Sequence, residues 1–245
     1  MRVIMNTELI YLKDNNLKQV TAKLIKMETT EQGQYCIFDQ SVFYPKGGGQ
    51  ACDVGTISND SKVVFDISYT GFHEGQVLHY GDFKDFQFAE GSSWELKIDP
   101  AVRLTNSKGH TAGHLVHLVM EELVPELTAT KGHHFPKDAY IRFDGLTNVD
   151  RDELILKANE NIKKYIDEGF PVKSEILSLD QLKKLVKNIP FNLPEDKPLR
   201  TIAIGEYFPV PCGGTHLNDL SELKSATITK IKHKKGNTVV GYAFD

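Results

Sequence analysis

The first hundred residues carry short segments of β-branched and aromatic residues with turn-forming residues between them. Such segments lie at 20–26, 35–38, 62–67 and 94–98, and Glu31-Gln-Gly33 is one of the clusters that separate them. Strands typically have this composition, and glycine and Asn/Asp clusters mark the turns that join them. Several short strands at this spacing predict a small β-barrel or sandwich.

After Pro100 the apolar positions repeat at intervals of three and four residues instead. This spacing places them on one face of a helix, and it predicts a helix over 103–124 that Pro125 ends. The apolar positions of this predicted helix are Leu115, Leu118, Val119 and Leu123.

Two further helices are predicted from their first residues. Asp150 with Glu153 has the spacing of a capping box and begins a helix over 151–168. Ser178 with Gln181 begins a short third helix in the same way. Strand-like segments lie between and after these helices, at 140–143, 201–204, 226–231 and 238–244.

Together these segments predict an α+β protein of two domains. The first, over 1–98, is a small β-barrel, and the second, over 99–245, combines helices and strands. A chain of 245 residues is long enough for one large domain or two modest ones.

Composition and charge narrow the class of protein. The chain is 40% hydrophobic and 25% charged, and its net charge of −4 means that any RNA surface must be a local patch. Three cysteines form no disulfide framework, charge occurs too early for a signal peptide, and no apolar run could span a membrane. Rossmann and Walker glycine spacings are absent. We therefore expect a cytoplasmic protein with no membrane partner and no nucleotide cofactor.

Candidate chemistry is concentrated in two histidine-containing motifs. His110 and His114 lie four residues apart in a predicted helix, so both rings face one point. Cys212 and His216 flank a Gly-Gly turn that lets both side chains point the same way. Three imidazoles and one thiolate suit one tetrahedral zinc ion. We predict that these four residues bind a single zinc ion, provided that the fold brings the two motifs together.

Other histidines fit this zinc site less well. His117 lies between two apolar residues of the same predicted helix, as a packed side chain does. His133 and His134 are adjacent in an extended segment and face opposite ways, so both cannot easily bind one metal. A nucleophilic Cys212 paired with His216 is the alternative chemistry, but it has no evident orienting carboxylate and leaves the first motif unexplained.

These motifs resemble those of the alanyl-tRNA editing proteins, the free-standing relatives of the editing domain of alanyl-tRNA synthetase. The most specific block is Cys212-Gly-Gly-Thr-His-Leu217, and Phe43-Tyr-Pro-Lys-Gly-Gly-Gly-Gln50 supports it independently. The resemblance covers most of the chain and implies the longer form, with a β-barrel domain before the editing domain. The other matching segments are Cys52-Asp-Val-Gly55, His110-Thr-Ala-Gly-His-Leu115, Lys131-Gly132 and Arg142-Phe-Asp144.

The resemblance implies a zinc-dependent hydrolase whose partner is mischarged tRNA(Ala), and the family's zinc ligands map onto the four residues named above. Members of the family hydrolyse the ester that joins a wrong amino acid to tRNA(Ala), chiefly serine and in some members glycine. A synthetase pocket cannot strongly reject serine, which is alanine plus one hydroxyl, so a second, hydrolytic site is needed. That site must reject alanine and needs a polar partner for the serine hydroxyl.

The resemblance also implies which residues contact the substrate. Thr130, just before the Lys-Gly pair, has the position expected for the polar partner of the serine hydroxyl, and Thr128 is the rival if the loop register differs. An isolated triple glycine usually indicates only a turn. Here it implies a loop beside the editing pocket, whose backbone amides approach the tRNA 3′ end, formed by Gly47, Gly48, Gly49 and Gln50.

Three alternatives stay open. Four protein ligands are typical of structural zinc, whereas catalytic zinc keeps an open position, so the ion either activates a water or only positions the ester. An editing module for Ser-tRNA(Thr) is a rival, although the Gly-Gly-Gly-Gln loop and the intact Cys-Gly-Gly-Thr-His block argue against it. A tRNA-binding module with a purely structural zinc is the rival that is not an enzyme.

A tRNA partner requires cations even on an acidic protein. The best candidates lie in a predicted hairpin whose turn is marked by Gly236-Asn237. They are Lys230, Lys232, Lys234 and Lys235. Lys224 is a further candidate near the C-terminus, and a second group on the third predicted helix comprises Lys183, Lys184 and Lys187.

Overall fold

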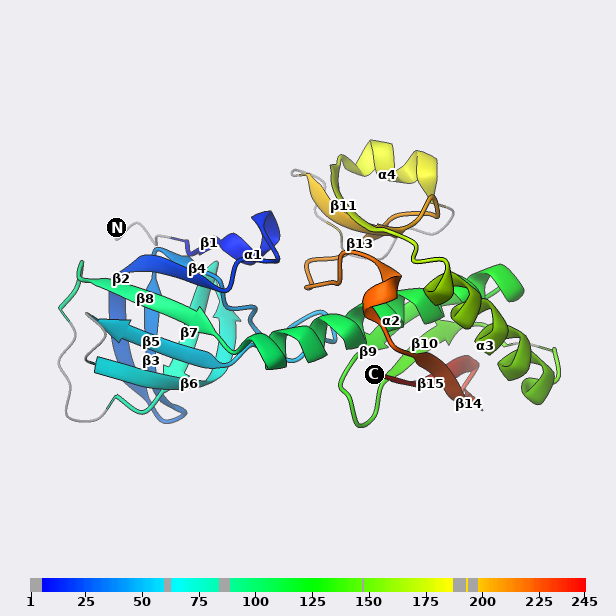
Figure 1. Ribbon diagram of the computed structural model, residues 1–245, viewed down its shortest axis with the longest axis horizontal. Coiled ribbons are helices and arrows are strands. Elements are labelled where there is room, and N and C mark those ends of the chain that lie inside the picture. The colour runs from blue at the N-terminus through cyan, green and yellow to red at the C-terminus, as the bar shows by residue number, and fades with distance from the viewer. Residues whose placement is uncertain (1–5, 60–62, 84–88, 147, 187–192, 194–197) are drawn as a thin grey trace. The chain divides into compact units, whose positions relative to one another are not determined.

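The computed structural model describes residues 6–59, 63–83, 89–146, 148–186, 193 and 198–245 (Figure 1). Two compact units make up the chain: Met1–Gly47 with Ala51–Leu104, and Gly48–Gln50 with Thr105–Asp245. The main division between these units lies between Leu104 and Thr105, inside α2 (Pro100–Leu123) and a few residues after the domain boundary predicted near Asp99. The tripeptide 48–50 belongs to the second unit although its neighbours in sequence belong to the first.

Six strands of the first unit form a closed barrel in the order β2-β3-β7-β6-β5-β8 (Figure 1). Burial alternates along β8, where Trp94, Leu96 and Ile98 face the core, as expected for strands with one solvated face. Strands β5 and β7 were not predicted, because each buries only one or two side chains. The elements of this unit are β1 (Glu8–Leu9), α1 (Ile10–Lys13), β2 (Gln19–Thr30), β3 (Gly33–Phe38), β4 (Gln40–Ser41), β5 (Gly55–Asn59), β6 (Val63–His73), β7 (Gln76–Gly81) and β8 (Ser93–Ile98).

The second unit contains helices, a four-stranded sheet in the order β14-β15-β10-β9 and a three-stranded sheet in the order β11-β12-β13 (Figure 1). The chain is therefore α+β, as predicted. The helical elements are α2 (Pro100–Leu123), which begins in the first unit, α3 (Arg151–Asp167), α4 (Leu179–Leu185) and the 3-10 turn η1 (Leu220–Glu222). The strands are β9 (Thr128–His133), β10 (Tyr140–Asp144), β11 (Val172–Leu177), β12 (Leu199–Ile204), β13 (Val210–Pro211), β14 (Ala226–Lys234) and β15 (Asn237–Phe244).

The three predicted helices are present, and local signals explain where two of them begin. The Asp150 carboxylate accepts hydrogen bonds from the backbone N–H groups of Asp152 and Glu153 at the start of α3. Ser178 and Gln181 form the reciprocal capping box of α4. Of the described helices, none is long and apolar enough to cross a membrane.

The hairpin between β14 and β15 turns one residue earlier than predicted. Lys234 pairs with Asn237, so the two turn residues are Lys235 and Gly236, with φ values of 51° and 80°. Two adjacent residues with positive φ are the requirement of a tight hairpin turn that matches the strand twist. Asn237 is therefore the first residue of β15 rather than part of the turn.

A buried ion pair ties the first turn of α2 to the barrel in the first unit. The side chains of Arg103 and Asp53 are 1% and 0% exposed, and Nε of Arg103 lies 3.1 and 3.0 Å from the two carboxylate oxygens. The guanidinium also donates to the carbonyl oxygens of Val42 at 2.6 Å and Asn15 at 3.1 Å. Asp53 accepts a further bond from the backbone N–H of Tyr44 at 2.7 Å. Through these hydrogen bonds Arg103 connects the first turn of α2 to the three segments that contain Asn15, Val42 and Asp53.

We expect Arg103→Ala to lower the free energy of unfolding by about 3–5 kcal/mol, because it leaves the Asp53 carboxylate buried without its cation. Denaturant unfolding would measure the loss, and adding Asp53→Asn should recover part of it by removing the uncompensated charge. Lys97→Ala, on the exposed side of β8, is the control and should change stability by less than about 0.5 kcal/mol. A loss below about 1 kcal/mol in the Arg103 variant would contradict this account.

Candidate metal centre

The two histidine-containing motifs meet in the second unit. His110 and His114 of α2 and Cys212 and His216 of the loop after β13 each place one ligand atom within 4.8 Å of the other three. Sγ of Cys212 lies 3.5 Å from Nε2 of His110 and 3.3 Å from Nε2 of His216. Zinc bond lengths of about 2.0–2.3 Å put neighbouring ligand atoms of a tetrahedron about 3.6 Å apart. The four side chains could therefore hold a metal ion, and their spacing fits zinc.

Outer hydrogen bonds orient two of the imidazoles. Nδ1 of His110 lies 2.7 Å from the amide oxygen of Gln50, which can only accept, so Nδ1 carries the proton and Nε2 presents its lone pair to the centre. Nδ1 of His216 lies 3.1 Å from the hydroxyl oxygen of Thr111, and Nε2 is again the inner atom. Metal-binding histidines usually have such an outer partner.

Burial controls the protonation of the ligands. It lowers the pKa of His110, His114 and His216 well below the usual value, and the positive charges of neighbouring groups act in the same direction. The rings are therefore neutral, as metal ligands must be. Burial also raises the pKa of the Cys212 thiol, so a thiolate at this position needs the positive charge of a bound cation.

Gln50 connects the helix α2 that carries His110 to the loop that carries Cys212 and His216. Its side chain is 1% exposed, and its amide oxygen accepts from His110 and from the backbone N–H of Thr215, at 2.7 and 3.0 Å. Its amide nitrogen donates to the Thr215 hydroxyl at 2.9 Å, which also accepts from Ser107 at 2.8 Å. Gln50 therefore orients a ligand and holds the ligand loop, while the substrate contact predicted for it stays a prediction.

Arg200 of β12 holds the same loop from the other side. Its Nη1 donates to the carbonyl oxygens of Cys212 and Gly214, at 2.8 and 2.9 Å. Gly214 must lack a side chain, because a Cβ there would lie 2.1 Å from Cε1 of His110. The sequence pattern gave no sign of Arg200, since nothing local distinguishes it from other strand cations.

A cavity of about 660 Å³ lies beside the four ligands, within the range of small-molecule sites. Thr128 and Thr130 both line it. The Thr130 hydroxyl donates to the carbonyl oxygen of Arg142 at 3.1 Å and accepts from Nε of Arg142 at 3.2 Å. Its predicted contact with a serine hydroxyl therefore stays a prediction and would have to coexist with Arg142. The remaining walls include Gly48, His117, Lys131, Gly132, Tyr207 and Phe208.

The glycine loop is split between the two units. Gly47 belongs to the first unit, whereas Gly48 lines the cavity of the second, with a φ of 52°. Gly49 accepts the backbone N–H of His134 at 2.9 Å, and a Cβ on Gly49 would lie 2.3 Å from the carbonyl oxygen of Gly132. Close packing against β9 thus requires glycine at position 49.

His134 supports the centre without belonging to the group of four. Its ring stacks on His110 with centroids 4.3 Å apart. Its Nδ1 lies 2.8 Å from the Tyr242 hydroxyl, which donates to the carbonyl oxygen of Gly109 at 2.9 Å. A Cβ on Gly113 would lie 2.3 Å from Nδ1 of His134, so the small residue on α2 makes room for this ring. The sequence spacing did not reveal this role of His134, because the stack joins two residues from different elements, the helix α2 and the segment that follows β9.

Comparisons with known proteins show which proteins this chain resembles. The alanyl-tRNA editing protein AlaX-L of Pyrococcus horikoshii is 28% identical over 236 residues, which are 94% of this chain and 56% of that protein. The predicted resemblance to the alanyl-tRNA editing proteins is confirmed. The alanine–tRNA ligases of Streptococcus mutans and Alkaliphilus oremlandii are 30% and 27% identical over 89% and 76% of this chain.

The matches differ in how much of each relative they cover. This chain spans about half of the length of the editing protein, at 56%, and 25% and 21% of the two ligases. The family model described as tRNA synthetases class II (A) matches residues 5–102, which lie in the part of the chain that holds the barrel. The four candidate ligands lie outside that matched region, so their assignment rests on the geometry given above.

We expect Gln50→Leu to weaken zinc binding roughly 10- to 100-fold, because His110 loses the acceptor that sets its tautomer and ring orientation. Titration of the protein against a chromogenic chelator would measure the affinity. Gln19→Leu, on the exposed first residue of β2, is the control and should leave the affinity unchanged. Equal affinities in both variants would show that the centre does not depend on the outer hydrogen bond.

Proposed function

We propose that this protein binds one zinc ion at His110, His114, Cys212 and His216 and hydrolyses mischarged tRNA(Ala). The observation that carries the proposal is the convergence of four side chains that could hold a metal ion, three of which, His110, His114 and Cys212, line a cavity within the same unit. The relatives, an alanyl-tRNA editing protein and alanine–tRNA ligases, support tRNA(Ala) as the substrate class. The reaction cleaves the ester between the amino acid and the tRNA 3′ end with one water.

We propose separate roles for the metal ion and for the protein's own side chains. When bound, the ion supplies Lewis-acid charge beside the scissile ester. The protein's own groups hold the ligands: Gln50 and Thr111 direct the imidazoles, and Arg200 anchors the loop. Tyr207 and Phe208 line the cavity with large aromatic surface, while Gly48 lets a ligand approach the backbone closely.

Serine is the amino acid that we propose this site removes, with glycine as a second possible substrate. Alanine must be spared, so binding has to depend on a polar group that pairs with the serine hydroxyl. Thr130 and Thr128 are the two hydroxyl-bearing side chains of β9 that line the cavity. We assign the serine contact to Thr130 and keep Thr128 as the comparison.

The RNA contacts proposed for this enzyme begin with the hairpin lysines. All four side chains are exposed, three on β14 and one in the turn. They are Lys230, Lys232, Lys234 and Lys235. In the second predicted group, Lys183 lies 3.9 Å from Asp180, and Lys187 is outside the described residues.

We expect Cys212→Ala to lose zinc and the deacylation of Ser-tRNA(Ala) together, with the rate falling about 100-fold or more, because the variant loses both a ligand and the charge that the ion supplies. Zinc content and deacylation of Ser-tRNA(Ala), Ala-tRNA(Ala) and Ser-tRNA(Thr) would be measured on one sample. Cys52→Ala, in the first unit, is the matched control and should retain both properties.

The outcomes separate the rivals. Loss of serine from tRNA(Ala) alone supports the proposal, whereas loss from tRNA(Thr) favours the threonine system. A zinc-loaded protein that binds tRNA without hydrolysis would be a binding module. Full activity of the Cys212 variant without metal would overturn the role of zinc.

We expect Thr130→Val to reduce the preference for Ser-tRNA(Ala) over Ala-tRNA(Ala) by about tenfold, since the substrate hydroxyl would be left without its partner. The ratio of the two kcat/KM values is the measurement, and Thr128→Val is the matched comparison. Unchanged discrimination in the first variant together with a loss in the second would move the serine contact to Thr128.

A further inference from the structure

The outward face of the four-stranded sheet carries cations in register across its strands. Lys131 of β9 pairs with Arg142 of β10, Arg142 with Val239 of β15, and Val239 with Lys232 of β14. Three of the four positions of this row are cations. The adjacent residues of the two central strands, Ile141 before Arg142 and Val240 after Val239, are 4% and 0% exposed and face the core. Because side chains alternate along a strand, the row of cations faces away from the core.

The next outward row adds one cation and an aromatic group. His133 pairs with Tyr140, Tyr140 with Gly241, and Gly241 with Lys230. The His133 ring is stacked between those of Phe135 and Tyr140, with centroids 4.4 and 5.2 Å apart and interplanar angles of 19° and 28°. All three rings are partly exposed. Partly exposed aromatic rings of this kind are stacking surfaces for unpaired bases.

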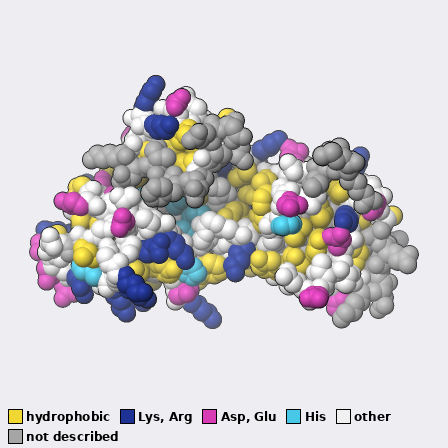
Figure 2. All heavy atoms as spheres, turned by 180° about the vertical axis from the view of Figure 1, so that it is seen from behind, with side chains coloured by type: hydrophobic (Ala, Val, Ile, Leu, Met, Phe, Trp, Pro, Cys, Tyr) yellow, Lys and Arg dark blue, Asp and Glu magenta, His cyan; other side chains and the backbone are white. Residues whose placement is uncertain are grey.

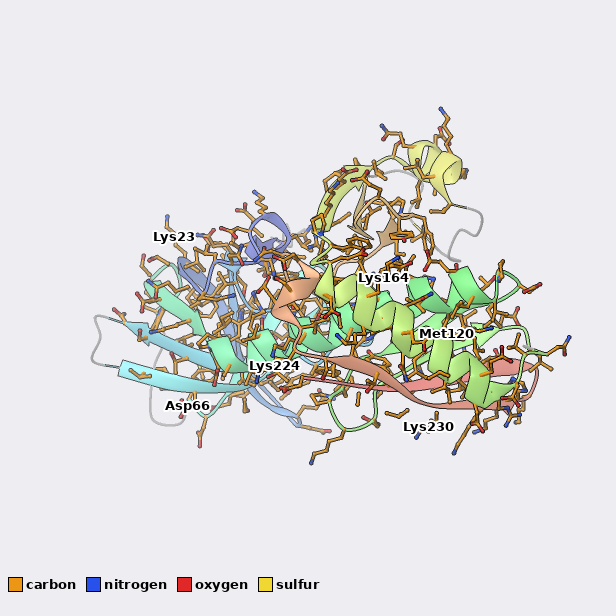
Figure 3. All side chains as sticks on the ribbon, turned by 45° about the vertical axis from the view of Figure 1, so that its right-hand side comes forward. Lys23, Asp66, Met120, Lys164, Lys224 and Lys230 are labelled. Atoms are coloured by element: carbon orange, nitrogen blue, oxygen red, sulfur yellow. The ribbon has the colours of Figure 1, made fainter. Side chains whose placement is uncertain are left out.

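The cations of this face have no acidic partner among the residues that the structure describes. No ion pair joins Lys131, Arg142, Lys230 or Lys232 to a carboxylate of the described residues, and Figure 2 shows Lys and Arg side chains gathered in the region of this sheet. Figure 3 shows Lys230 on the side of β14 that faces away from α3. The lysines of α3 differ, because each has an acidic partner four residues away. These pairs are Lys157 with Glu153, Lys163 with Asp167 and Lys164 with Glu168.

Two acidic side chains lie at the margin of the face. Asp138 is 3.2 Å from Nε2 of His133, and Asp144 is the last residue of β10, paired in register with Asn237. Neither forms an ion pair with Lys131, Arg142 or Lys232. The centre of the face therefore keeps its positive potential.

The same face is continuous with the cavity beside the metal centre. Lys131 is part of the outward row and also lines the cavity, and Thr130, which borders the cavity, contacts Arg142. A polyanion that lies along the sheet would therefore reach the cavity mouth at β9. The positive charge, the exposed aromatic rings and the access to the cavity all favour the same type of partner.

We propose that this sheet face is an RNA-docking surface, on which Lys131, Arg142, Lys230 and Lys232 bind phosphates and the ring stack around His133 receives an unpaired base. The choice of tRNA(Ala) as the RNA rests on the proposed function. An anionic membrane would satisfy the cations but gives no role to the stacked rings or to the continuity with the cavity. RNA accounts for all three observations.

The test is the binding of uncharged tRNA(Ala) to the intact protein at several salt concentrations. The double variant Arg142→Gln/Lys232→Gln should bind about tenfold or more weakly. The negative slope of log K against log salt should become shallower by about two, one for each lost phosphate contact. Tyr140→Leu should weaken binding about tenfold with little change in slope, since it removes stacking rather than charge. Circular dichroism would verify that each variant is folded.

The matched control is Lys157→Gln/Lys163→Gln on α3, whose cations are paired with carboxylates and should leave affinity and slope unchanged. An equal loss in the control and the sheet variant, or an unchanged slope in the sheet variant, would overturn the inference. So would binding to vesicles of phosphatidylcholine and phosphatidylserine with no binding to tRNA. Because uncharged tRNA is used, binding by this face without any deacylation would uphold the inference and overturn only the proposed hydrolysis.

Discussion

Four donor atoms from segments about a hundred residues apart must stay within 4.8 Å of one another, and the second unit is built around that requirement. Burial keeps the three imidazoles neutral and would keep Cys212 a thiol, so the group gains its full ligand character only when a cation is present. Free imidazoles packed this closely need rigid support. The buried helix α2 supplies it on one side, and Arg200, by binding two loop carbonyls, supplies it on the other.

The glycine-rich block shows how sequence neighbours can serve different units. Gly47 and Ala51 belong to the barrel unit, whereas the three residues between them pack into the second unit. Gly49 approaches β9 so closely that any side chain at this position would collide with Gly132. This approach places the Gln50 amide within hydrogen-bond distance of His110. The glycines therefore act on the metal centre indirectly, by letting a buried amide reach a ligand. A substitution in this block would disturb ligand geometry even without touching substrate.

How much the sequence could predict depended on the range of the interaction. Helix starts at Asp150 and Ser178 are set by contacts within three residues, and the spacing of four between ligands is equally local. The outer partners of the ligands are not local: Gln50 lies 60 residues from His110 and 165 from Thr215. No periodic pattern encodes such contacts. The turn of the last hairpin lies at Lys235 and Gly236 rather than at Gly236-Asn237, and it is marked by the positive φ values of those two residues, one of which is not glycine.

Net charge is a poor guide to what this protein presents to a polyanion. The overall value of −4 combines lysines of α3 that form ion pairs with carboxylates and cations of the sheet face that form none with the described part of the chain. Exposed charges separated by more than about 8–10 Å are screened at physiological salt, so the local face decides what is attracted. A second bulge, between Arg142 and Phe143, lets β9 serve that face and the cavity at once: Lys131 pairs outward with Arg142, Ala129 pairs with Phe143, and Thr130 is the extra residue between them. One irregular strand thus links the charged surface to the cavity beside the candidate metal centre.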